Sequence, residues 1–163
     1  MEEKPLGTAG ALSLVPTDVD TPLLVVNGDI ITQIDYGALA LHHDTNGREA
    51  TIAAAQYEVT IPFGVVDYDE SGSVQSIKEK PHYVRYVLAG INLLNPSVYR
   101  SLPPSLPLDM PDLLQHAIDG SLDVGVFPIH EHWRDLGSPE ELESARKAAP
   151  ILNPPPGPAG GVS

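Results

Sequence analysis

The sequence predicts an α/β fold, in which a sheet flanked by helices carries a β-hairpin insertion. Three observations predict this class. Short apolar runs alternate with helical patterns, Pro and Gly residues separate them, and one strong hairpin signal interrupts the alternation. The length of 163 residues fits one domain and is sufficient to bury a core of ordinary size.

The first elements expected along the chain are a strand, a helix and a second strand. The run Leu-Leu-Val-Val at residues 23–26 lies between turn-forming residues, which predicts a central parallel strand buried on both faces. Asp35 is placed to cap a helix that ends near the Thr-Asn-Gly of residues 45–47. Residues 50–59 then predict the second strand.

The middle of the chain predicts a hairpin followed by another strand. Residues 64–68 and 74–77 have strand character and flank Asp-Glu-Ser-Gly at residues 69–72, the strongest hairpin signal in the chain. Residues 86–94 predict the next strand, which contains a glycine. A helix should then start at Pro111. Its expected buried residues are Leu113, Leu114, Ala117 and Ile118.

The C-terminal part predicts one more strand, one more helix and a tail. Residues 124–129 form the expected strand. Ser138 as N-cap, followed by Pro at the first helical position and Glu at the third, predicts a helix through residue 148. Residues 150–163 are dominated by Pro and Gly, so we expect a disordered tail after a folded domain that spans residues 1–149.

Charge and composition exclude several classes of function. Nine Lys and Arg stand against 22 Asp and Glu, and the net charge of -13 argues against a nucleic-acid surface, which needs clustered cations. Because the chain has no Cys, it has no disulfide, Cys-based zinc site or thiol nucleophile. No apolar run approaches the ~20 residues that cross a bilayer, and no signal peptide is visible. We therefore expect a cytoplasmic protein without membrane contact.

Carboxylates near the ends of predicted strands are the candidates for chemistry. Asp29 follows the run at residues 23–26 and stands beside Gly28, where the backbone can approach a ligand closely. Asp135 follows the strand at residues 124–129. Since ligands of α/β sheets bind at the carboxyl ends of the strands, the two carboxylates could together hold Mg²⁺. An ordinary turn at Asp29 is an equally good interpretation of that residue alone.

The remaining charged residues and histidines give weaker signals. Glu79 and Lys80 follow the hairpin, and such a pair suits a sugar hydroxyl and a phosphate, although it is more often solvated surface. His130 and His132 are expected to be surface imidazoles because no third metal ligand stands nearby. His43 and the histidine before it point in different directions on a helix, so they predict no site.

Six motifs taken together resemble those of the sugar-1-phosphate nucleotidyltransferases. In chain order they are Pro-Leu-Gly-Thr-Ala-Gly-Ala at 5–11, Val-Val-Asn-Gly-Asp at 25–29, Pro-Phe-Gly-Val-Val at 62–66, Glu-Lys-Pro at 79–81, Ala-Gly-Ile at 89–91, and Phe-Pro-Ile at 127–129 leading to Trp-Arg-Asp-Leu-Gly-Ser-Pro at 133–139. The match covers residues 2 to about 148. It is most similar to the mannose- or heptose-1-phosphate guanylyltransferase and glucose-1-phosphate thymidylyltransferase branches.

The resemblance implies a Rossmann-like nucleotide-diphospho-sugar transferase sheet with a β-hairpin insertion. The implied reaction moves a nucleotidyl group from a nucleoside triphosphate to a sugar 1-phosphate and releases pyrophosphate. Asp29 and Asp135 would be the catalytic pair and would hold Mg²⁺ against the phosphates. The implied substrate-binding residues are Leu6, Gly7 and Thr8 along the nucleobase, Gly64, Glu79, Lys80 and Gly90 around the sugar and its phosphate, and also Gly28 and Trp133.

Some departures from the family pattern bear on activity. Leu88 stands where guanylyltransferases often have Asn. Family members open with a glycine-rich loop of the form G-G-x-G-T-R-L, and nothing in the chain resembles it. We therefore expect an N-terminally truncated domain that has little activity alone, with strand 23–26 uncovered along one side. Its partner would be a second copy of the chain or a separate N-terminal segment.

Two other functions stay open at this point. The chain could be a non-catalytic module that binds a sugar phosphate or a nucleotide sugar together with a partner segment. It could also be an unrelated α/β hydrolase that uses Asp29 as its nucleophile. The sequence leaves the nucleobase, the sugar and the oligomeric state undetermined.

Overall fold

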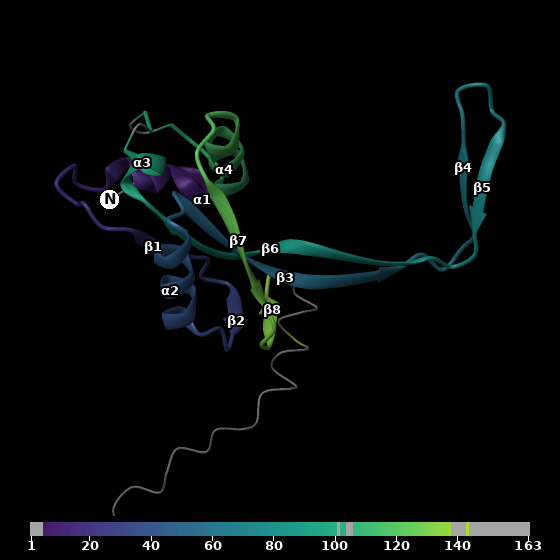
Figure 1. Ribbon diagram of the computed structural model, residues 1–163, viewed down its shortest axis with the longest axis horizontal. Helices are drawn as coiled ribbons and strands as arrows, with labels where there is room; N and C mark the ends of the chain where they lie inside the picture. Colours follow the sequence, from purple (N-terminus) through teal and green to yellow (C-terminus); the bar gives the residue numbers. More distant parts are fainter. Residues whose placement is uncertain (1–4, 101, 104–105, 138–142, 144–163) are drawn as a thin grey trace, which may run out of the picture.

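The computed structural model describes residues 5–100, 102–103, 106–137 and 143. Its centre is a four-stranded mixed sheet, which Figure 1 shows between the helices. The strand order is β1 (Leu23–Val26), β6 (His82–Leu94), β3 (Ala50–Thr60) and β7 (Val124–Ile129). β6 runs antiparallel to both of its neighbours, and β3 is parallel to β7. Three strands therefore point in one direction, which confirms the predicted α/β class.

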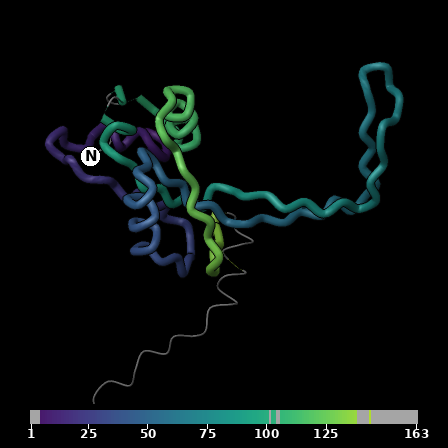
Figure 2. Tube along the Cα trace, in the orientation of Figure 1, coloured from purple at the N-terminus to yellow at the C-terminus, as the bar shows by residue number. Residues whose placement is uncertain are grey.

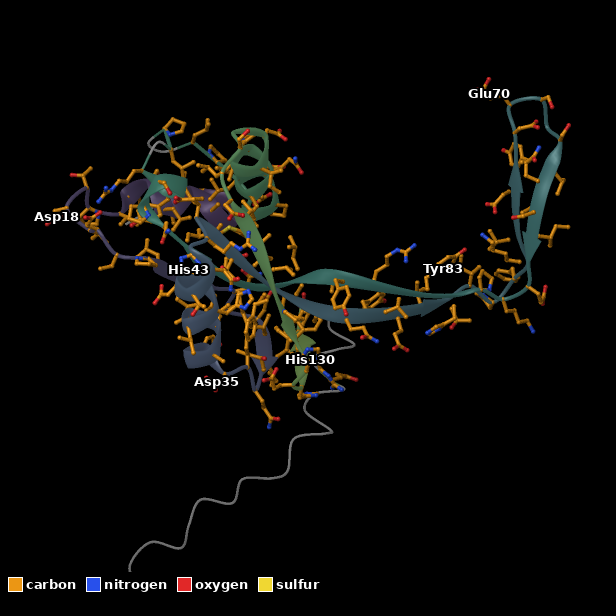
Figure 3. The ribbon with its side chains drawn as sticks, viewed as in Figure 1. Asp18, Asp35, His43, Glu70, Tyr83 and His130 are labelled. Carbon is orange, nitrogen blue, oxygen red and sulfur yellow. The ribbon has the colours of Figure 1, made fainter. Side chains whose placement is uncertain are left out.

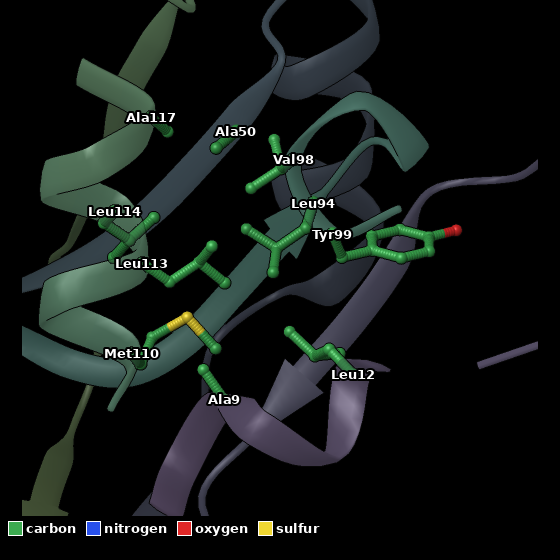
Figure 4. Close-up of a cluster of buried hydrophobic side chains, with 10 residues drawn as sticks. All are labelled: Ala9, Leu12, Ala50, Leu94, Val98, Tyr99, Met110, Leu113, Leu114 and Ala117. Atoms are coloured by element: carbon green, nitrogen blue, oxygen red, sulfur yellow. The ribbon is translucent and has the colours of Figure 1, made fainter. Parts of the chain in front are cut away.

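Helices cover both faces of this sheet (Figure 1). One face carries α1 (Gly7–Gly10), the 3₁₀ helix η1 (Ala11–Leu14), α3 (Pro96–Tyr99) and α4 (Met110–Asp119). The other carries α2 (Tyr36–Asn46) and the small sheet of β2 (Ile30–Thr32) and β8 (Trp133–Asp135). Figure 4 shows the first core cluster, in which Leu94 of β6 packs among Met110, Leu113 and Leu114. Burying such side chains contributes roughly 1.5–3 kcal/mol each.

The helix boundaries follow local signals in the sequence. The Asp35 carboxylate accepts a hydrogen bond from the amide of Ala38 at 3.0 Å, and Gly47 ends α2 with a φ of 61°. The predicted cap at Asp35 and the predicted helix end near residues 45–47 are both confirmed. α4 begins at Met110, one residue before the expected start. Ile118 is 50% exposed, so its predicted burial was wrong, because the buried stripe of α4 turns toward Met110 instead.

β1 is an edge strand, which corrects the predicted central strand buried on both faces. Within the described part of the chain it pairs with β6 alone, in the antiparallel sense. Leu24 is 46% exposed and Val26 is 41% exposed. Four consecutive apolar residues cannot distinguish a central strand from an edge strand, because periodicity does not report which neighbours are present.

The predicted hairpin is confirmed and forms the end of a projecting arm (Figures 1 and 2). β4 (Val65–Tyr68) pairs antiparallel with β5 (Val74–Lys78). The pairing of β3 with β7 stops at Ala55, whereas β3 and β6 continue as a two-stranded ribbon to Thr60. We call this ribbon and its hairpin, residues 56–86, the arm. It exposes large apolar side chains such as Phe63, Tyr68 and Ile77.

The tip of the hairpin is organised by Asp69. Its Oδ1 accepts hydrogen bonds from the Ser71 hydroxyl at 2.6 Å and from the amides of Ser71 and Ser73 at 2.9 and 3.1 Å. The hydroxyl of Ser71, with help from the amide of Ser73, lowers the pKa of the Asp69 carboxyl below its usual 3.8. The charged form is the one that these donors stabilise.

Acid is therefore expected to loosen this turn. A carboxyl whose pKa is lowered by folding stabilises the fold above its unfolded pKa, and this contribution disappears as the pH falls through the folded pKa. In an NMR titration, the Asp69 carboxyl should show a midpoint below 3.8, and the amide signals of Ser71 and Ser73 should shift with it. A midpoint at or above 3.8 would contradict the proposed hydrogen bonds. So would amide signals of Ser71 and Ser73 that do not shift during the titration.

His43 has a structural role that the sequence did not predict. It is a buried residue of α2, 2% exposed, and is labelled in Figure 3. Nε2 lies 3.0 Å from Oδ1 of Asn95, and Nδ1 lies 2.8 Å from the hydroxyl of Thr51. Because an amide oxygen only accepts, Nε2 is the donor to Asn95. The ring thus ties α2 to β3 and to the start of α3.

Two predicted segments lie outside the described residues. They are the helix over residues 138–148, of which only residue 143 is described, and the tail at 150–163. None of the described helices combines the length and apolar character needed to cross a bilayer.

Candidate functional site

The small sheet of β2 and β8 brings Asp29 and Asp135 together. Ile30 of β2 pairs with Asp135 of β8, and the amide of Leu136 donates to the carbonyl of Asp29 at 2.7 Å. A methyl group placed on Gly137 would lie 3.0 Å from Oδ1 of Asp135 and 3.9 Å from Oδ2 of Asp29. The two carboxylate oxygens are therefore both within 4 Å of one point.

This pair offers a donor set that suits a hard divalent cation. Both carboxylates are exposed, and Oδ1 of Asp135 is oriented by the amide of Gly137 at 2.7 Å. Among the described residues no group of three or more His, Asp or Glu side chains could hold a metal ion. Mg²⁺ commonly takes one or two carboxylates and completes its shell with phosphate oxygens and water. The residues present thus fit Mg²⁺ when a phosphate-bearing ligand supplies other oxygens.

Three hollows near the carboxylates share some of their lining residues. The Asp29 hollow, of about 430 Å³, is lined by Thr8, Val25, Val26, Asn27, Gly28 and Asp29. The Gly90 hollow, of about 330 Å³, shares Thr8 and Asn27 with it and adds Leu88, Gly90 and the start of α4. The Trp133 hollow, of about 640 Å³, shares Leu88 and adds Gln56, Tyr57, Trp133, Arg134, Asp135 and Gly137. Six of the predicted site residues therefore line these three hollows.

The backbone at Ala89 and Gly90 is fixed from both sides. The Trp133 indole donates to the carbonyl of Ala89 at 2.9 Å, and the amide of Asn27 donates to the carbonyl of Gly90 at 2.8 Å. Gly90 has a φ of 70°, and a methyl group there would lie 2.8 Å from Nδ2 of Asn27. The pairing register of β6 with β3 shifts at this point. Such a bulge exposes backbone groups beside a ligand site, and only glycine fits here at low cost.

Thr8 and Asp109 fix the N-terminal segment against α4. Oδ1 of Asp109 accepts from the Thr8 amide at 3.1 Å, while the Thr8 hydroxyl accepts from the Met110 amide at 2.7 Å. The Thr8 hydroxyl therefore satisfies an amide in the first turn of α4, as a capping side chain would. Leu6 is 8% exposed, so its side chain belongs to the packed interior.

The structure does not bring the other predicted sugar-binding residues to this surface. Gly64, Glu79 and Lys80 lie at the base of the hairpin on the arm, far from β2 and β8 (Figure 1). There the Lys80 amide donates to the carbonyl of Phe63, and Oε2 of Glu79 lies 3.2 Å from where a methyl on Gly64 would be. Their role in sugar binding stays a prediction.

The histidines named as candidates form no site. His130 and His132 are exposed near the end of β7, as expected, and His130 is labelled in Figure 3. Sequence reasoning missed other residues that line the hollows. Asn27 and Gly137 lie within the quoted motifs and could have been singled out there, whereas no local signal marked Asp109.

Comparisons with known proteins identify the family to which the chain belongs. A family model described as nucleotidyl transferase matches residues 1–150. The mannose-1-phosphate guanylyltransferase catalytic subunit beta of Drosophila melanogaster is 33% identical over 179 aligned residues, covering 99% of this chain and 47% of that protein. The mannose-1-phosphate guanyltransferase of Debaryomyces hansenii is 33% identical over 155 residues, covering 88% of this chain and 41% of that protein. The chain spans less than half the length of these relatives.

A solved structure supports the fold. HddC from Yersinia pseudotuberculosis, solved in complex with GMP-PN, superimposes with a TM-score of 0.63 at 20% identity, covering 90% of this chain and 64% of that one. The family model covers most of the chain, and both curated relatives exceed 30% identity. The chain belongs to the nucleotidyl transferase family.

Proposed function

We propose that the chain forms the metal-binding and sugar-facing part of a sugar-1-phosphate nucleotidyltransferase. The observation that carries the proposal is the convergence of the Asp29 and Asp135 carboxylates within 4 Å of one point. They stand between a hollow lined by Thr8 and a hollow lined by Trp133. The relatives named mannose-1-phosphate guanylyltransferases support this reaction over the α/β hydrolase alternative.

In this proposal the residues act by positioning and by charge. Transfer between phosphates needs little covalent help from the protein, so orientation and electrostatics supply most of the rate. Asp29 and Asp135 hold Mg²⁺, which when bound offsets the negative charge of the phosphates. The Thr8 side takes the nucleotide and the Trp133 side takes the sugar. An oxygen of the sugar phosphate then attacks the α-phosphorus in line, and pyrophosphate leaves.

The charge around the hollows supports weak turnover by this chain alone. Among the described residues that line the three hollows, Arg134 is the only lysine or arginine. The net charge is -13, whereas a nucleoside triphosphate is strongly anionic. A cationic segment from elsewhere would have to neutralise the triphosphate. The same shortage of cations supports the second candidate, a module that binds a sugar phosphate or nucleotide sugar without catalysis.

Pyrophosphate release tests the two candidates. GTP or dTTP is offered with mannose 1-phosphate or glucose 1-phosphate to the chain alone and to the chain fused to the N-terminal half of the Drosophila relative. We expect Mg²⁺-dependent release by the fusion protein, loss of release in its Asp29→Asn variant, and little release by the chain alone. Binding of the substrates by the fusion protein without release of pyrophosphate would favour the non-catalytic module. The absence of any substrate binding would contradict both candidate functions.

The partner and location of the chain stay predictions. Phe63, Tyr68 and Ile77 on the arm are each about 70% exposed, which supports cover by a second copy or by a partner segment. Light scattering after size-exclusion chromatography measures directly whether two copies of the chain associate. A cytoplasmic location rests on the sequence alone.

A further inference from the structure

We propose that the Gly90 hollow binds an acetamido group carried by the sugar 1-phosphate, and that Asn92 selects it. This inference rests on the proposed function, because it assigns the substrate class of the same site. Its structural basis is one buried amide side chain that has no hydrogen-bond partner among the described residues.

Asn92 is a polar residue in an apolar stretch of β6. It is 4% exposed and stands between Ile91 and Leu93, which are 0% and 8% exposed. β6 is paired on both sides at this point, with Val25 of β1 and with Ile52 of β3, so the backbone of Asn92 belongs to the sheet. Asparagine is disfavoured in strands. The pairing of the strands therefore does not explain why an asparagine stands here.

The side chain of Asn92 faces the Gly90 hollow. Regular pairing with β3 places it on the same side of β6 as Leu94, which packs against α4. Asn92 lines the hollow together with Met110 and Pro111, the first two residues of α4. Within the part of the chain that the structure describes, its amide makes no hydrogen bond. A buried amide without a partner costs free energy, so a ligand in the hollow would supply what the protein does not.

The lining of the hollow defines the chemistry of this ligand. No lysine, arginine or histidine is found among the described residues that line it, so it does not suit a phosphate. Asn92 can donate through Nδ2, whereas an ionised carboxylate such as that of Asp109 only accepts. Leu88, Met110 and Pro111 supply hydrocarbon. An acetamido group matches this set, because its carbonyl accepts, its N–H donates and its methyl group is apolar.

The hollow neighbours the place where the sugar phosphate is proposed to bind. It shares Thr8 and Asn27 with the Asp29 hollow and Leu88 with the Trp133 hollow. In a sugar 1-phosphate the phosphate is attached to the first ring carbon, so the substituent on the second carbon is the nearest to it. The acetamido group is therefore expected on the second carbon, as in a 2-acetamido-2-deoxyhexose 1-phosphate.

Pairs of sugar phosphates that differ only at the second carbon test the inference. Calorimetry with Mg²⁺ present compares glucose 1-phosphate with N-acetylglucosamine 1-phosphate, and mannose 1-phosphate with N-acetylmannosamine 1-phosphate. We expect the acetamido sugar to bind about tenfold more tightly in at least one pair, because its carbonyl and its N–H each gain a hydrogen bond. In the Asn92→Leu variant this preference should disappear.

The stability of Asn92→Leu distinguishes a ligand-binding amide from a structural one. Leucine has nearly the shape of asparagine without its polar atoms, so the variant should unfold at the same urea concentration as the wild type or at a higher one. A lower unfolding midpoint would overturn the claim that the Asn92 amide has no partner within the protein.

Asn95→Leu is the matched control, because the amide of Asn95 has partners within the protein. Its Oδ1 lies 3.0 Å from Nε2 of His43, and its Nδ2 donates to the carbonyl of Arg48 at 2.9 Å. This variant should unfold at a lower urea concentration than the wild type, since it leaves buried groups without partners. While it is folded, it should keep the preference for the acetamido sugar.

Failure of this inference differs from failure of the proposed function. Equal binding within both pairs by the wild type, or tighter binding of the sugars without the acetamido group, would overturn the inference and leave the proposed function intact. An unchanged preference in Asn92→Leu would overturn the role of Asn92. If the folded wild type binds none of the four sugar phosphates, the proposed function fails, and the inference fails with it.

Discussion

The Asp135→Asn variant is expected to bind a nucleotide sugar at least about 100-fold more weakly than the wild type when Mg²⁺ is present. The change keeps the size of the side chain and leaves an oxygen that can accept from the Gly137 amide, which lies at 2.7 Å. It removes the negative charge that the cation and its phosphate ligands require. Calorimetric titration of GDP-mannose, with Mg²⁺ and then with EDTA, measures the effect.

The Asp44→Asn variant is the control for the loss of one negative charge away from the proposed metal site. Asp44 belongs to α2 and lines none of the three hollows among the described residues. This variant should bind GDP-mannose with the affinity of the wild type, and EDTA should weaken its binding to the same extent as in the wild type. The proposed metal site would be wrong if Asp135→Asn bound with wild-type affinity, or if EDTA had no effect on the wild type.

Gly7→Ala is expected to lower the free energy of unfolding by about 2–4 kcal/mol. Gly7 has a φ of 74°, which costs energy for any residue with a Cβ atom. An added methyl would lie 2.6 Å from the carbonyl oxygen of Leu108 and 2.7 Å from Oδ1 of Asp109. Relief of these contacts must pull the N-terminal segment away from α4, so the hydrogen bonds of Thr8 would weaken too. Urea denaturation followed by circular dichroism measures the loss.

Gly28→Ala is the matched control for stability. It adds the same methyl group, but no atom lies within 4 Å of that methyl and the φ of Gly28 is not positive. Its free energy of unfolding should stay within about 0.5 kcal/mol of the wild type, as for most surface substitutions. Equal losses of unfolding free energy in the two variants would contradict the claim that the close contacts at Gly7 cause the destabilisation.

Elements that depend on local signals could be predicted from the sequence. The Asp35 cap and the left-handed Gly47 define α2 within a few residues, and the turn at 69–72 defines the hairpin. The apolar pattern of residues 23–26 does not by itself place β1 at a sheet edge, because that position depends on strands that are distant in sequence. Only the family resemblance led us to expect one uncovered side. His43 was overlooked for the same reason: its partner Asn95 is far along the chain, so nothing local marks the ring as buried.

The candidate site, too, could be predicted only in part from the sequence. Their positions after predicted strands identified Asp29 and Asp135 as candidates, and the family motifs implied that they hold a metal. Their convergence, however, depends on β2 and β8. Each of these strands has three residues, which is too short for a periodic signal. The contact of Thr8 with Asp109 likewise joins two chain segments whose pairing no spacing rule reveals.

The most direct measurement is an anomalous difference map from a crystal of the chain soaked in Mn²⁺ and GDP-mannose. We predict one peak within about 2.2 Å of a carboxylate oxygen from Asp29 and of one from Asp135, with the diphosphate completing the shell. A diphosphate bound in the hollows without such a peak, or a peak bonded to only one of the two carboxylates, would contradict the shared metal site.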